Sequence, residues 1–507
     1  GLTLSSPVLH SVFYYDTYAF LGRNGFPSYT YDGSRESEGY GTWYGDSCGE
    51  YSHKGLQTGS INFPLQTHAP ALYLVSYYDK YRRCIQTHSS HLLGGCDSEY
   101  LSYDFAGKLL KRLHVQTALG TASQNELYTY RYDHAGRLLE IRHSLNGGSE
   151  VSLSERGYDA IGRLVFEKKH SNDIRSWIEN IRNPLFSQSL HYTDGAGIPY
   201  YNGNISSMTW RTGDTLINKG YKYSYDGLSR MTDAIYGEGL SLSDNPNRFS
   251  EHVTAYDKMG NILRLLRYGK TPNGDYGLID NLNLLYDGNR LQSVYDNAIF
   301  SAAPSGMEFK DGSNSSTEYV YDAIGNLTKD LNKNIVDIQY NFLNLPCRVK
   351  FENGNSISYL YDANGTKLCA TYVIGNDTTV TDYCGNVVYE NGTPVKLLTE
   401  VGYVTLDDSK YHYFIQDYQG NIRVVVDEDG VVEEVNDYYP FGGLMASSSE
   451  SVQSYKYNGK ELERKGGLDW YDYGARHYDA TIGRWYSVDP SGEKYYSWSP
   501  YVYCKNN

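Results

Sequence analysis

A seven-residue motif recurs along this chain and restricts its fold more than any other feature. The motif is Tyr-Asp-x-x-Gly, followed by Lys, Arg or Asn and then by Leu or Ile. Strict copies begin at Tyr103, Tyr132, Tyr158, Tyr256 and Tyr321, and looser copies begin at Tyr225, Tyr286, Tyr340, Tyr361 and Gln416. Tyr103 and Tyr132 are 29 residues apart, whereas Tyr340 and Tyr361 are 21 apart. A motif that recurs at this spacing indicates a repeat architecture with connections of variable length.

The chemistry of the motif predicts a tight turn between two strands. Asp at the first turn position and Gly at the fourth are the preference of a type I turn. The Asp side chain can accept a hydrogen bond from the backbone N–H two residues on, and Gly can adopt a positive φ. Residues before the turn alternate with a period of two, as at Tyr128, Tyr130 and Tyr132, which indicates a strand. We expect hairpin turns at Asp104–Gly107, Asp133–Gly136, Asp159–Gly162, Asp257–Gly260, Asp322–Gly325 and Asp362–Gly365.

The composition agrees with an all-β chain. Of 507 residues, 54 are Tyr and 51 are Gly, so residues that favour strands and turns are abundant. A single hairpin is unstable in water, so the hairpins are expected to pair edge to edge into one long antiparallel sheet. Ladders of Tyr side chains across neighbouring strands would hold it together and keep their hydroxyls in water. Such a sheet suggests a wall around a solvent-filled space.

Charge and cysteine content exclude several classes of function. The chain has 60 acidic and 45 basic residues, a net charge of −15 without a basic run, so a nucleic-acid partner is not expected. No apolar stretch is long enough to span a bilayer. The seven cysteines are scattered without a C-x-x-C pair, which favours isolated thiols. His88 and His91 have a spacing of three on an expected loop, but we predict no zinc site there, and no cofactor.

The repeated motif resembles the YD repeats of the RHS (rearrangement hot spot) family, which is related to the toxin-complex C components and to teneurins. The C-terminal end is similar to the RHS repeat-associated core domain in four stretches, which are Asp437-Tyr-Tyr-Pro-Phe-Gly-Gly443, Trp470-Tyr-Asp-Tyr-Gly-Ala-Arg-His-Tyr-Asp479, Ile482-Gly-Arg-Trp-Tyr-Ser-Val-Asp-Pro490 and Ser499-Pro-Tyr-Val-Tyr-Cys-Lys-Asn-Asn507. His477, Ala480 and Ser499 stand where the family has Tyr, Pro and Asn. Residues 1–76 resemble the lead-in segment of Bacteroidota-type members.

The resemblance implies a hollow β-shell, closed or partial, made of YD-repeat hairpins that spiral round a space. Residues 77–436 would form this shell, and residues 437–507 would form a core domain that plugs one end. In the family, the shell encloses a C-terminal toxin domain, which is the expected partner. Members continue past the position of Asn507 with a second Asp-Pro and the toxin, so we expect this chain by itself to be uncleaved. The resemblance also implies a secreted or cell-surface protein that serves in interbacterial competition.

Release of the toxin in the family is an aspartyl autoproteolysis, and the resemblance carries two of its residues onto Asp489 and Arg484. Two carboxylates are needed because one must be ionised to activate water while the other is protonated. Asp489 would be the first carboxylate, and Arg484 its basic neighbour. The alternative is structural. Asp489-Pro-Ser-Gly492 is a good type I turn, and Arg484 could stack on Trp485 and Tyr486.

Two classes of function therefore remain open. The first is a structural container for a toxin, whose only enzymatic activity would be self-cleavage in its full-length form. The second is an adhesion module whose β-surface contacts a glycan or a cell-surface protein. The aromatic content could suggest carbohydrate stacking, but the strand alternation of the Tyr residues favours packing between strands.

Overall fold

The computed structural model describes residues 8–45, 54–65, 69–158, 164–166, 170–172, 178–212, 217–448 and 451–507. Regular structure in these ranges is almost entirely β, which confirms the predicted all-β fold. The helices there are short 3-10 helices: η1 (Gly33–Glu38), η2 (Tyr457–Gly459), η3 (Lys465–Gly467), η4 (Gly492–Lys494) and η5 (Cys504–Asn506). None of them is long and apolar enough to cross a membrane.

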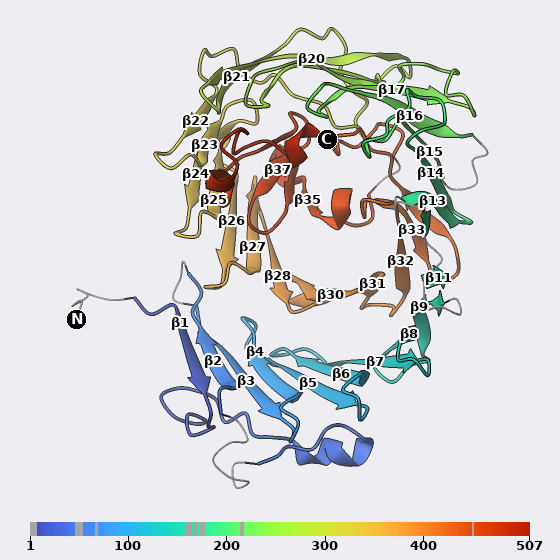
Figure 1. Ribbon diagram of the computed structural model, residues 1–507. Coiled ribbons are helices and arrows are strands. Elements are labelled where there is room, and N and C mark those ends of the chain that lie inside the picture. The colour runs from blue at the N-terminus through green and yellow to red at the C-terminus, as the bar shows by residue number, and fades with distance from the viewer. Residues whose placement is uncertain are drawn as a thin grey trace. The chain divides into compact units, whose positions relative to one another are not determined.

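Within each sheet the strands follow one another in chain order, and most neighbours are joined as hairpins (Figure 1). The first sheet comprises β1 (Ser11–Tyr15), β2 (Gln57–Asn62), β3 (Leu72–Tyr78), β4 (Cys84–Ser90), β5 (Cys96–Tyr103), β6 (Leu109–Thr117), β7 (Gln124–Tyr132), β8 (Leu138–Leu145) and β9 (Val151–Glu155). A small sheet pairs β10 (Gly157–Tyr158) with β11 (Leu164–Phe166). The third sheet comprises β12 (His170–Asn172), β13 (Ile178–Asn183), β14 (Phe186–His191), β15 (Ser207–Thr212), β16 (Lys219–Tyr225), β17 (Met231–Glu238), β18 (Glu251–Tyr256), β19 (Ile262–Lys270), β20 (Tyr276–Asp287) and β21 (Arg290–Asp296).

The remaining strands form a long and a short sheet. The long one comprises β22 (Tyr319–Tyr321), β23 (Leu327–Asp330), β24 (Ile335–Tyr340), β25 (Pro346–Phe351), β26 (Ser356–Tyr361), β27 (Lys367–Ile374), β28 (Asp377–Cys384), β29 (Val387–Glu390), β30 (Thr393–Thr399), β31 (Gly402–Thr405), β32 (Tyr411–Gln416), β33 (Ile422–Asp427) and β34 (Val432–Val435). The short one comprises β35 (Glu461–Glu463), β36 (Trp470–Asp472), β37 (His477–Asp479) and β38 (Arg484–Trp485).

The antiparallel hairpins are as predicted, but the strands are divided among several sheets rather than forming a single one. The break between β21 and β22 spans residues 297–318, a stretch with Pro304, Gly306, Gly312 and several Ser residues. Such residues are poor strand formers, and Pro cannot donate to a ladder, so pairing stops there. By its internal contacts the chain comprises two compact units, which are described separately. Unit 1 is Gly1–Glu167, Tyr359–Thr371 and Thr378–Lys410; unit 2 is Lys168–Ser358, Tyr372–Asp377 and Tyr411–Asn507.

The predicted hairpin turns share one geometry. In the turns that start at Asp104, Asp133, Asp257, Asp322 and Asp362, the Gly N–H donates to the Asp carbonyl at 2.9–3.3 Å, and the Gly φ lies between 78° and 94°. At Asp133 the carboxylate also accepts the N–H of Ala135 at 2.9 Å, the bond expected two residues on. The five turns are therefore confirmed, and Asp159–Gly162 lies outside the described residues. A positive φ explains why the fourth position is Gly.

The sixth motif position has a role that the sequence analysis missed. Its side chain reaches back to the turn carboxylate: Arg137 Nε donates to Asp133 Oδ2 at 2.6 Å, and Asn261 Nδ2 donates to Asp257 Oδ2 at 2.7 Å. Arg and Asn both carry N–H groups at the end of the side chain, which can donate to this carboxylate. The restriction of this position to Lys, Arg or Asn was the signal, because the turn backbone alone does not require it.

The motif Tyr links each hairpin to the one before it. Its hydroxyl donates to the carbonyl of the seventh residue of the preceding copy, as from Tyr132 to Leu109 at 3.0 Å and from Tyr286 to Ile262 at 2.8 Å. The basic residue of one copy also lies over the Tyr ring of the next, with Arg137 4.6 Å from the ring centre of Tyr158. The sequence analysis expected these hydroxyls to remain in water, but they donate to backbone carbonyl groups. Each hairpin is thereby bonded to its neighbour outside the strand ladder.

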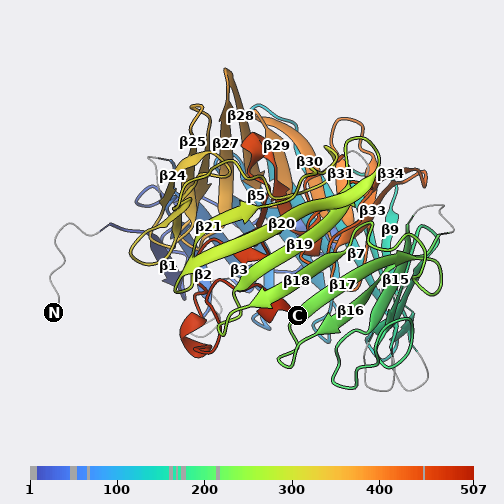
Figure 2. The ribbon, with the colours of Figure 1, turned by 90° about the horizontal axis from the view of Figure 1, so that it is seen from above.

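In unit 2 the C-terminal segment, residues 437–507, packs against the sheet strands. Figure 1 shows it in red beside the green and yellow strands, and Figure 2 shows β18, β19 and β20 lying side by side in the same unit. Its short strands surround an aromatic core made of Met307, Tyr438, Leu444, Tyr457, Leu462, Tyr471, Tyr478, Ala480, Trp485 and Tyr503. Asp437 follows β34, whereas the predicted boundary between residues 76 and 77 lies inside β3. The three-part domain division stays a prediction.

Candidate functional site

Asp489 lies in a turn near the C-terminus, as the structural alternative supposed. Its carbonyl accepts the N–H of Gly492 at 2.8 Å, and its carboxylate accepts the N–H of Ser491 at 2.8 Å. Its own N–H donates to the Pro500 carbonyl at 2.9 Å. The side chain is still 33% exposed, so one carboxylate edge remains open to solvent. The turn fixes the backbone at Asp489 without burying its acid group.

The basic partner of Asp489 is Arg476, whose Nη2 lies 3.2 Å from Asp489 Oδ2. The Arg476 guanidinium also lies 4.2 Å from the ring centre of Trp485, a cation–π distance. Burial lowers the pKa of Arg476. No ion pair joins Asp489 to Arg484 in the part of the chain that the structure describes. Sequence reasoning missed Arg476, although it belongs to the Tyr-Gly-Ala-Arg stretch that marked this segment.

Arg484 is 4% exposed and joins β38 to two hairpins of the third sheet. Its Nη1 donates to Asn261 Oδ1 at 3.0 Å, and its Nη2 donates to the Asn289 carbonyl. Its guanidinium lies 5.0 Å from the ring centre of Tyr286 and 4.5 Å from that of Tyr501. The stacking partners are therefore distant residues instead of the adjacent Trp485 and Tyr486. In this position Arg484 fixes the C-terminal segment on the repeat turns.

A second buried contact of that segment joins two carboxylates. The Tyr486 hydroxyl donates to Asp479 Oδ2 and lies 3.5 Å from Asp330 Oδ2. Lys333 Nζ lies 3.2 Å from Asp479, which gives this carboxylate a cation. No ion pair to Asp330 occurs among the residues that the structure describes, and burial raises its pKa to about 7. The arrangement holds one carboxylate that is charge-paired and one that binds a proton near neutral pH.

Two further ion clusters hold the same segment. Arg267 is fully buried, with Nε 2.8 Å from Glu251 and Nη1 bonded to Asp280, and its Nη2 donates to the Thr481 carbonyl at 3.1 Å. The sequence signal for this site was that Arg267, a charged residue, lies two positions after Leu265 and so on the same buried face of β19. Burial of such a pair is stabilising only when every group finds a partner.

Asp437 begins the segment and is fully buried. Its Oδ1 accepts the indole N–H of Trp210 at 2.7 Å and Arg423 Nη2 at 2.8 Å, and its Oδ2 accepts Lys219 Nζ at 2.6 Å. Burial would raise the pKa of Asp437, but the Lys219 ammonium and the Arg423 guanidinium hold it below its usual value. The first residue of the Asp-Tyr-Tyr-Pro-Phe-Gly stretch is therefore an anchor.

The other side chains considered from the sequence have ordinary roles. His88 bonds to Gln86 and Ser98, whereas His91 bonds to the Thr117 carbonyl, so the two imidazoles serve separate contacts. In the described ranges no group of three or more His, Cys, Asp or Glu could hold a metal ion. The cysteines in those ranges are unpaired, and Cys48 lies outside them.

No family model matches the chain. Among curated proteins, the toxin subunit YenC2 of Yersinia entomophaga is 43% identical over 438 residues, which cover 71% of this chain and 42% of YenC2. The toxin subunit YenC1 of the same organism is 24% identical over 455 residues, which cover 74% of this chain and 44% of YenC1. The chain is related to toxin subunits. It spans less than half the length of each of them.

A third curated relative is salivary gland surface protein 1 of Aedes aegypti, which is 24% identical over 398 residues, covering 71% of this chain and 11% of that protein. Among solved structures, the crystal structure of TcdB2–TccC3–Cdc42 aligns with a TM-score of 0.59 at 16% identity, over 89% of this chain and 26% of that one. The crystal structure of TcdB2–TccC3 without its hypervariable C-terminal region aligns with a TM-score of 0.57 at 15% identity, over 92% of this chain and 27% of that one. This likeness shows the fold.

These matches confirm the predicted relation to toxin-complex subunits. The relations to Bacteroidota-type members and to teneurins stay predictions. The fold prediction of large antiparallel sheets is confirmed both by the strands and by the likeness to TcdB2–TccC3.

Proposed function

We propose that this chain is the shell-forming part of a toxin subunit, and that it encloses a C-terminal effector domain of its own polypeptide. The observation that carries the proposal is the 43% identity to the toxin subunit YenC2 over 71% of this chain. The likeness to the TcdB2–TccC3 fold over 89% of the chain supports it. The protein would be secreted or placed at the cell surface, where interbacterial competition takes place.

Release of the effector would be a self-cleavage in the full-length product, and this would be its only enzymatic activity. Asp489 suits the part of one carboxylate because its side chain is partly exposed while its backbone is fixed. A second carboxylate of opposite protonation would complete the pair, one activating water and the other donating a proton. Arg484 would act as a positioning residue, because it anchors β38 on the repeat turns. No cofactor takes part in this scheme.

The test uses the full-length product of the gene that encodes this chain. The proposal predicts two fragments on a denaturing gel, and an Asp489→Asn variant that remains a single band because an amide cannot exchange protons as a carboxylic acid does. Asp469→Asn is the matched control, since Asp469 is a carboxylate of the same segment that pairs with Arg464. Two bands in the Asp489→Asn variant would remove Asp489 from the mechanism and leave it as a turn residue.

Enclosure is tested separately from cleavage. Limited proteolysis of the Asp489→Asn full-length product should leave the effector intact until the shell is unfolded by denaturant. Digestion of the effector at native conditions, at the rate of the isolated effector domain, would contradict enclosure.

One observation favours a second function, adhesion. The relative from Aedes aegypti is a surface protein by name and covers 71% of this chain at 24% identity. In that case the full-length product would remain a single chain on the cell surface and bind a glycan or a protein there. Surface labelling of intact cells together with the gel above separates the two functions.

A further inference from the structure

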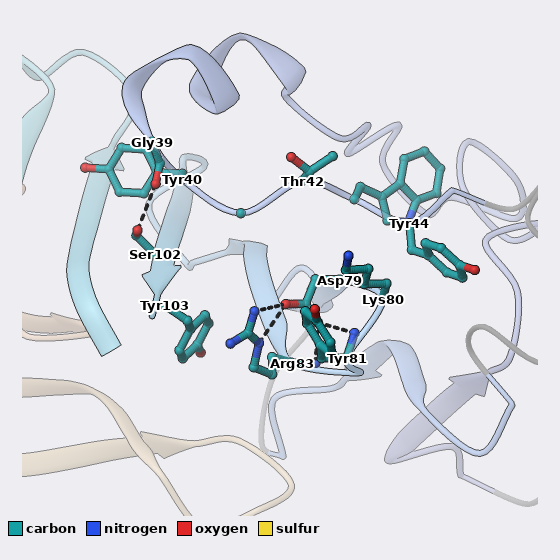
Figure 3. Close-up of a pocket in the computed structure, with 12 residues that line it drawn as sticks. Gly39, Tyr40, Thr42, Tyr44, Asp79, Lys80, Tyr81, Arg83, Ser102 and Tyr103 are labelled. Atoms are coloured by element: carbon teal, nitrogen blue, oxygen red, sulfur yellow. Dashed lines mark hydrogen bonds and ion pairs between the residues drawn. The ribbon is translucent and has the colours of Figure 1, made fainter. Parts of the chain in front are cut away.

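A pocket of about 410 Å³ lies in unit 1, near the start of the repeats (Figure 3). One side is the segment 39–44, which follows η1. The other side is the turn 79–83 between β3 and β4, with the last residues of β5 beside it. The volume is within the range of small-molecule sites in proteins.

Backbone contacts fix the segment 39–44 in place. The N–H of Gly41 donates to the Leu101 carbonyl at 3.1 Å, and the N–H of Tyr44 donates to the Tyr78 carbonyl at 3.2 Å. A Cβ atom at Gly41 would lie 2.4 Å from the Ile85 side chain, so only Gly allows this close approach. The wall of the pocket is therefore held in place by the sheet.

Five aromatic residues line the pocket: Tyr40, Trp43, Tyr44, Tyr81 and Tyr103. Trp43 packs on Tyr77 at 5.3 Å and Tyr40 lies 6.1 Å from Tyr100, so these two rings also belong to the core, whereas Tyr44 and Tyr81 lie outside the strands. Tyr44 is 38% exposed and Tyr81 is 63% exposed. The indole N–H of Trp43 is buried and has no hydrogen-bond partner in the described part of the chain. Exposed rings beside an unsatisfied donor are features of a ligand site more than of a core.

The charges around the pocket leave one cation without an acidic partner. Arg83 is neutralised by Asp79, with Nη2 2.6 Å from Oδ2, and its Nη1 donates to the Asp104 carbonyl at 2.9 Å. The Lys80 ammonium lies 5.0 Å from the ring centre of Tyr81, and no carboxylate pairs with it among the residues that the structure describes. The lining therefore has a net positive charge in a chain of net charge −15.

We propose that this pocket binds a saccharide that carries a carboxylate group. A sugar ring presents an apolar face of C–H groups, which packs on aromatic rings, and a rim of hydroxyls, which needs hydrogen-bond partners. Tyr44 and Tyr81 supply exposed rings, and the hydroxyl of Thr42 lies among the lining groups, whereas the Ser102 hydroxyl already donates to the Gly39 carbonyl at 2.8 Å. The carboxylate pairs with Lys80, because a charge-assisted bond to the unpaired ammonium is the strongest that the pocket offers. This inference does not rest on the enclosure of an effector.

The test is isothermal titration calorimetry of this chain with sialyllactose and with trigalacturonate, and with lactose as the neutral probe. We expect one of the acidic saccharides to bind with a Kd of roughly micromolar to millimolar order, and lactose to bind at least about tenfold more weakly. Lys80→Ala and Tyr81→Ala should each weaken acidic saccharide binding by about tenfold or more. The matched controls are Lys108→Ala and Phe105→Ala in the next hairpin turn, outside the pocket, which should bind as the wild type does.

Several outcomes would overturn the proposal. They are no binding of either acidic saccharide, equal binding of lactose, unchanged binding by Lys80→Ala, and equal competition by acetate, which would indicate a general anion effect. Thermal unfolding of each variant at the wild-type midpoint confirms that a loss of binding is not a loss of folding.

Discussion

The repeat turns and the C-terminal segment are held in opposite ways. A repeat turn closes on itself within seven residues, as where Asp133, Gly136 and Arg137 bond one another, and its Tyr then reaches the adjacent hairpin. The C-terminal segment is held mainly by side chains far away in the chain, as where Arg267 bonds the Thr481 carbonyl. The turns repeat the same contact many times, whereas each anchor of the segment occurs once. Loss of a turn is therefore expected to cost less than loss of an anchor.

The largest expected effect is on an anchor. Arg267→Met removes the cation that pairs with both Glu251 and Asp280 in the buried cluster and leaves these two carboxylates without it. We expect a loss of about 3–5 kcal/mol in the free energy of unfolding, measured from urea unfolding monitored by tryptophan fluorescence. The matched control is Arg264→Met, an exposed position on the same strand, which should change stability by less than about 0.5 kcal/mol. Equal losses in the two variants would mean that the cluster is not an anchor.

The next effect is a dependence of stability on pH, whose sign differs between the buried contact of Asp330 with the C-terminal segment and a repeat turn. Burial raises the pKa of Asp330 to about 7 from a usual value of 3.8. The native state therefore holds a proton that the unfolded chain has lost, and stability falls as pH rises from about 4 to 7. At Asp133 the backbone N–H and the guanidinium of Arg137 lower the pKa of the carboxyl. The turn is therefore stabilised at pH values above the usual pKa of Asp, 3.8, and loses that stabilisation as the pH falls.

Asp330→Asn should abolish the cost of ionising Asp330, on the order of 1–4 kcal/mol at pH 7, and make the fall in stability between pH 4 and 7 less steep. Thermal unfolding midpoints at each pH measure it. Asp337→Asn, at an exposed carboxylate on β24, is the control and should leave the slope of the wild type unchanged. A steeper fall in the Asp330→Asn variant than in the wild type would reverse the assignment.

The third-largest effect on stability is expected for a substitution in a single repeat turn. Gly136 has φ of 78°, which a β-branched residue adopts only under strain, so Gly136→Val should cost about 1–3 kcal/mol. Gly227 lies in the turn of a looser copy, has no positive φ and would place a Cβ in open space, so Gly227→Val is the matched control. Urea unfolding of the two variants should separate them. If both variants unfold at the wild-type midpoint, the local strain of the turn has no consequence for the fold.

The smallest effect is expected for one contact between hairpins. Tyr132→Phe deletes the hydroxyl that donates to the Leu109 carbonyl at 3.0 Å, which should cost about 0.5–1.5 kcal/mol. Tyr130→Phe on the same strand is the control, because no hydrogen bond of that hydroxyl occurs among the described residues. If Tyr132→Phe lowered the free energy of unfolding as much as Arg267→Met, this would contradict the view that each contact between repeats contributes only a small part of the stability.

The turns could be predicted in detail because the groups that make them are adjacent in the chain. An Asp that bonds its own backbone and a Gly with positive φ leave few other conformations to Tyr-Asp-x-x-Gly. The position of Asp489 in a turn was foreseen on the same ground. Arg476 as its partner was not, since nothing in the spacing of Arg476, Arg484 and Asp489 says which guanidinium faces the acid.

Apart from the boundary at Asp437, which rests on a resemblance and stays a prediction, the sequence by itself determined that the chain is all-β and where its hairpins turn. These follow from strand alternation and turn chemistry, which act over a few residues. Only the tertiary structure decided where the strands divide into sheets, which residues anchor the C-terminal segment, and that aromatic residues outside the strands meet at a pocket. Those features depend on contacts between residues far apart in the chain. Packing and the pairing of buried charges determine which of these contacts form, and neither can be deduced from the local sequence pattern.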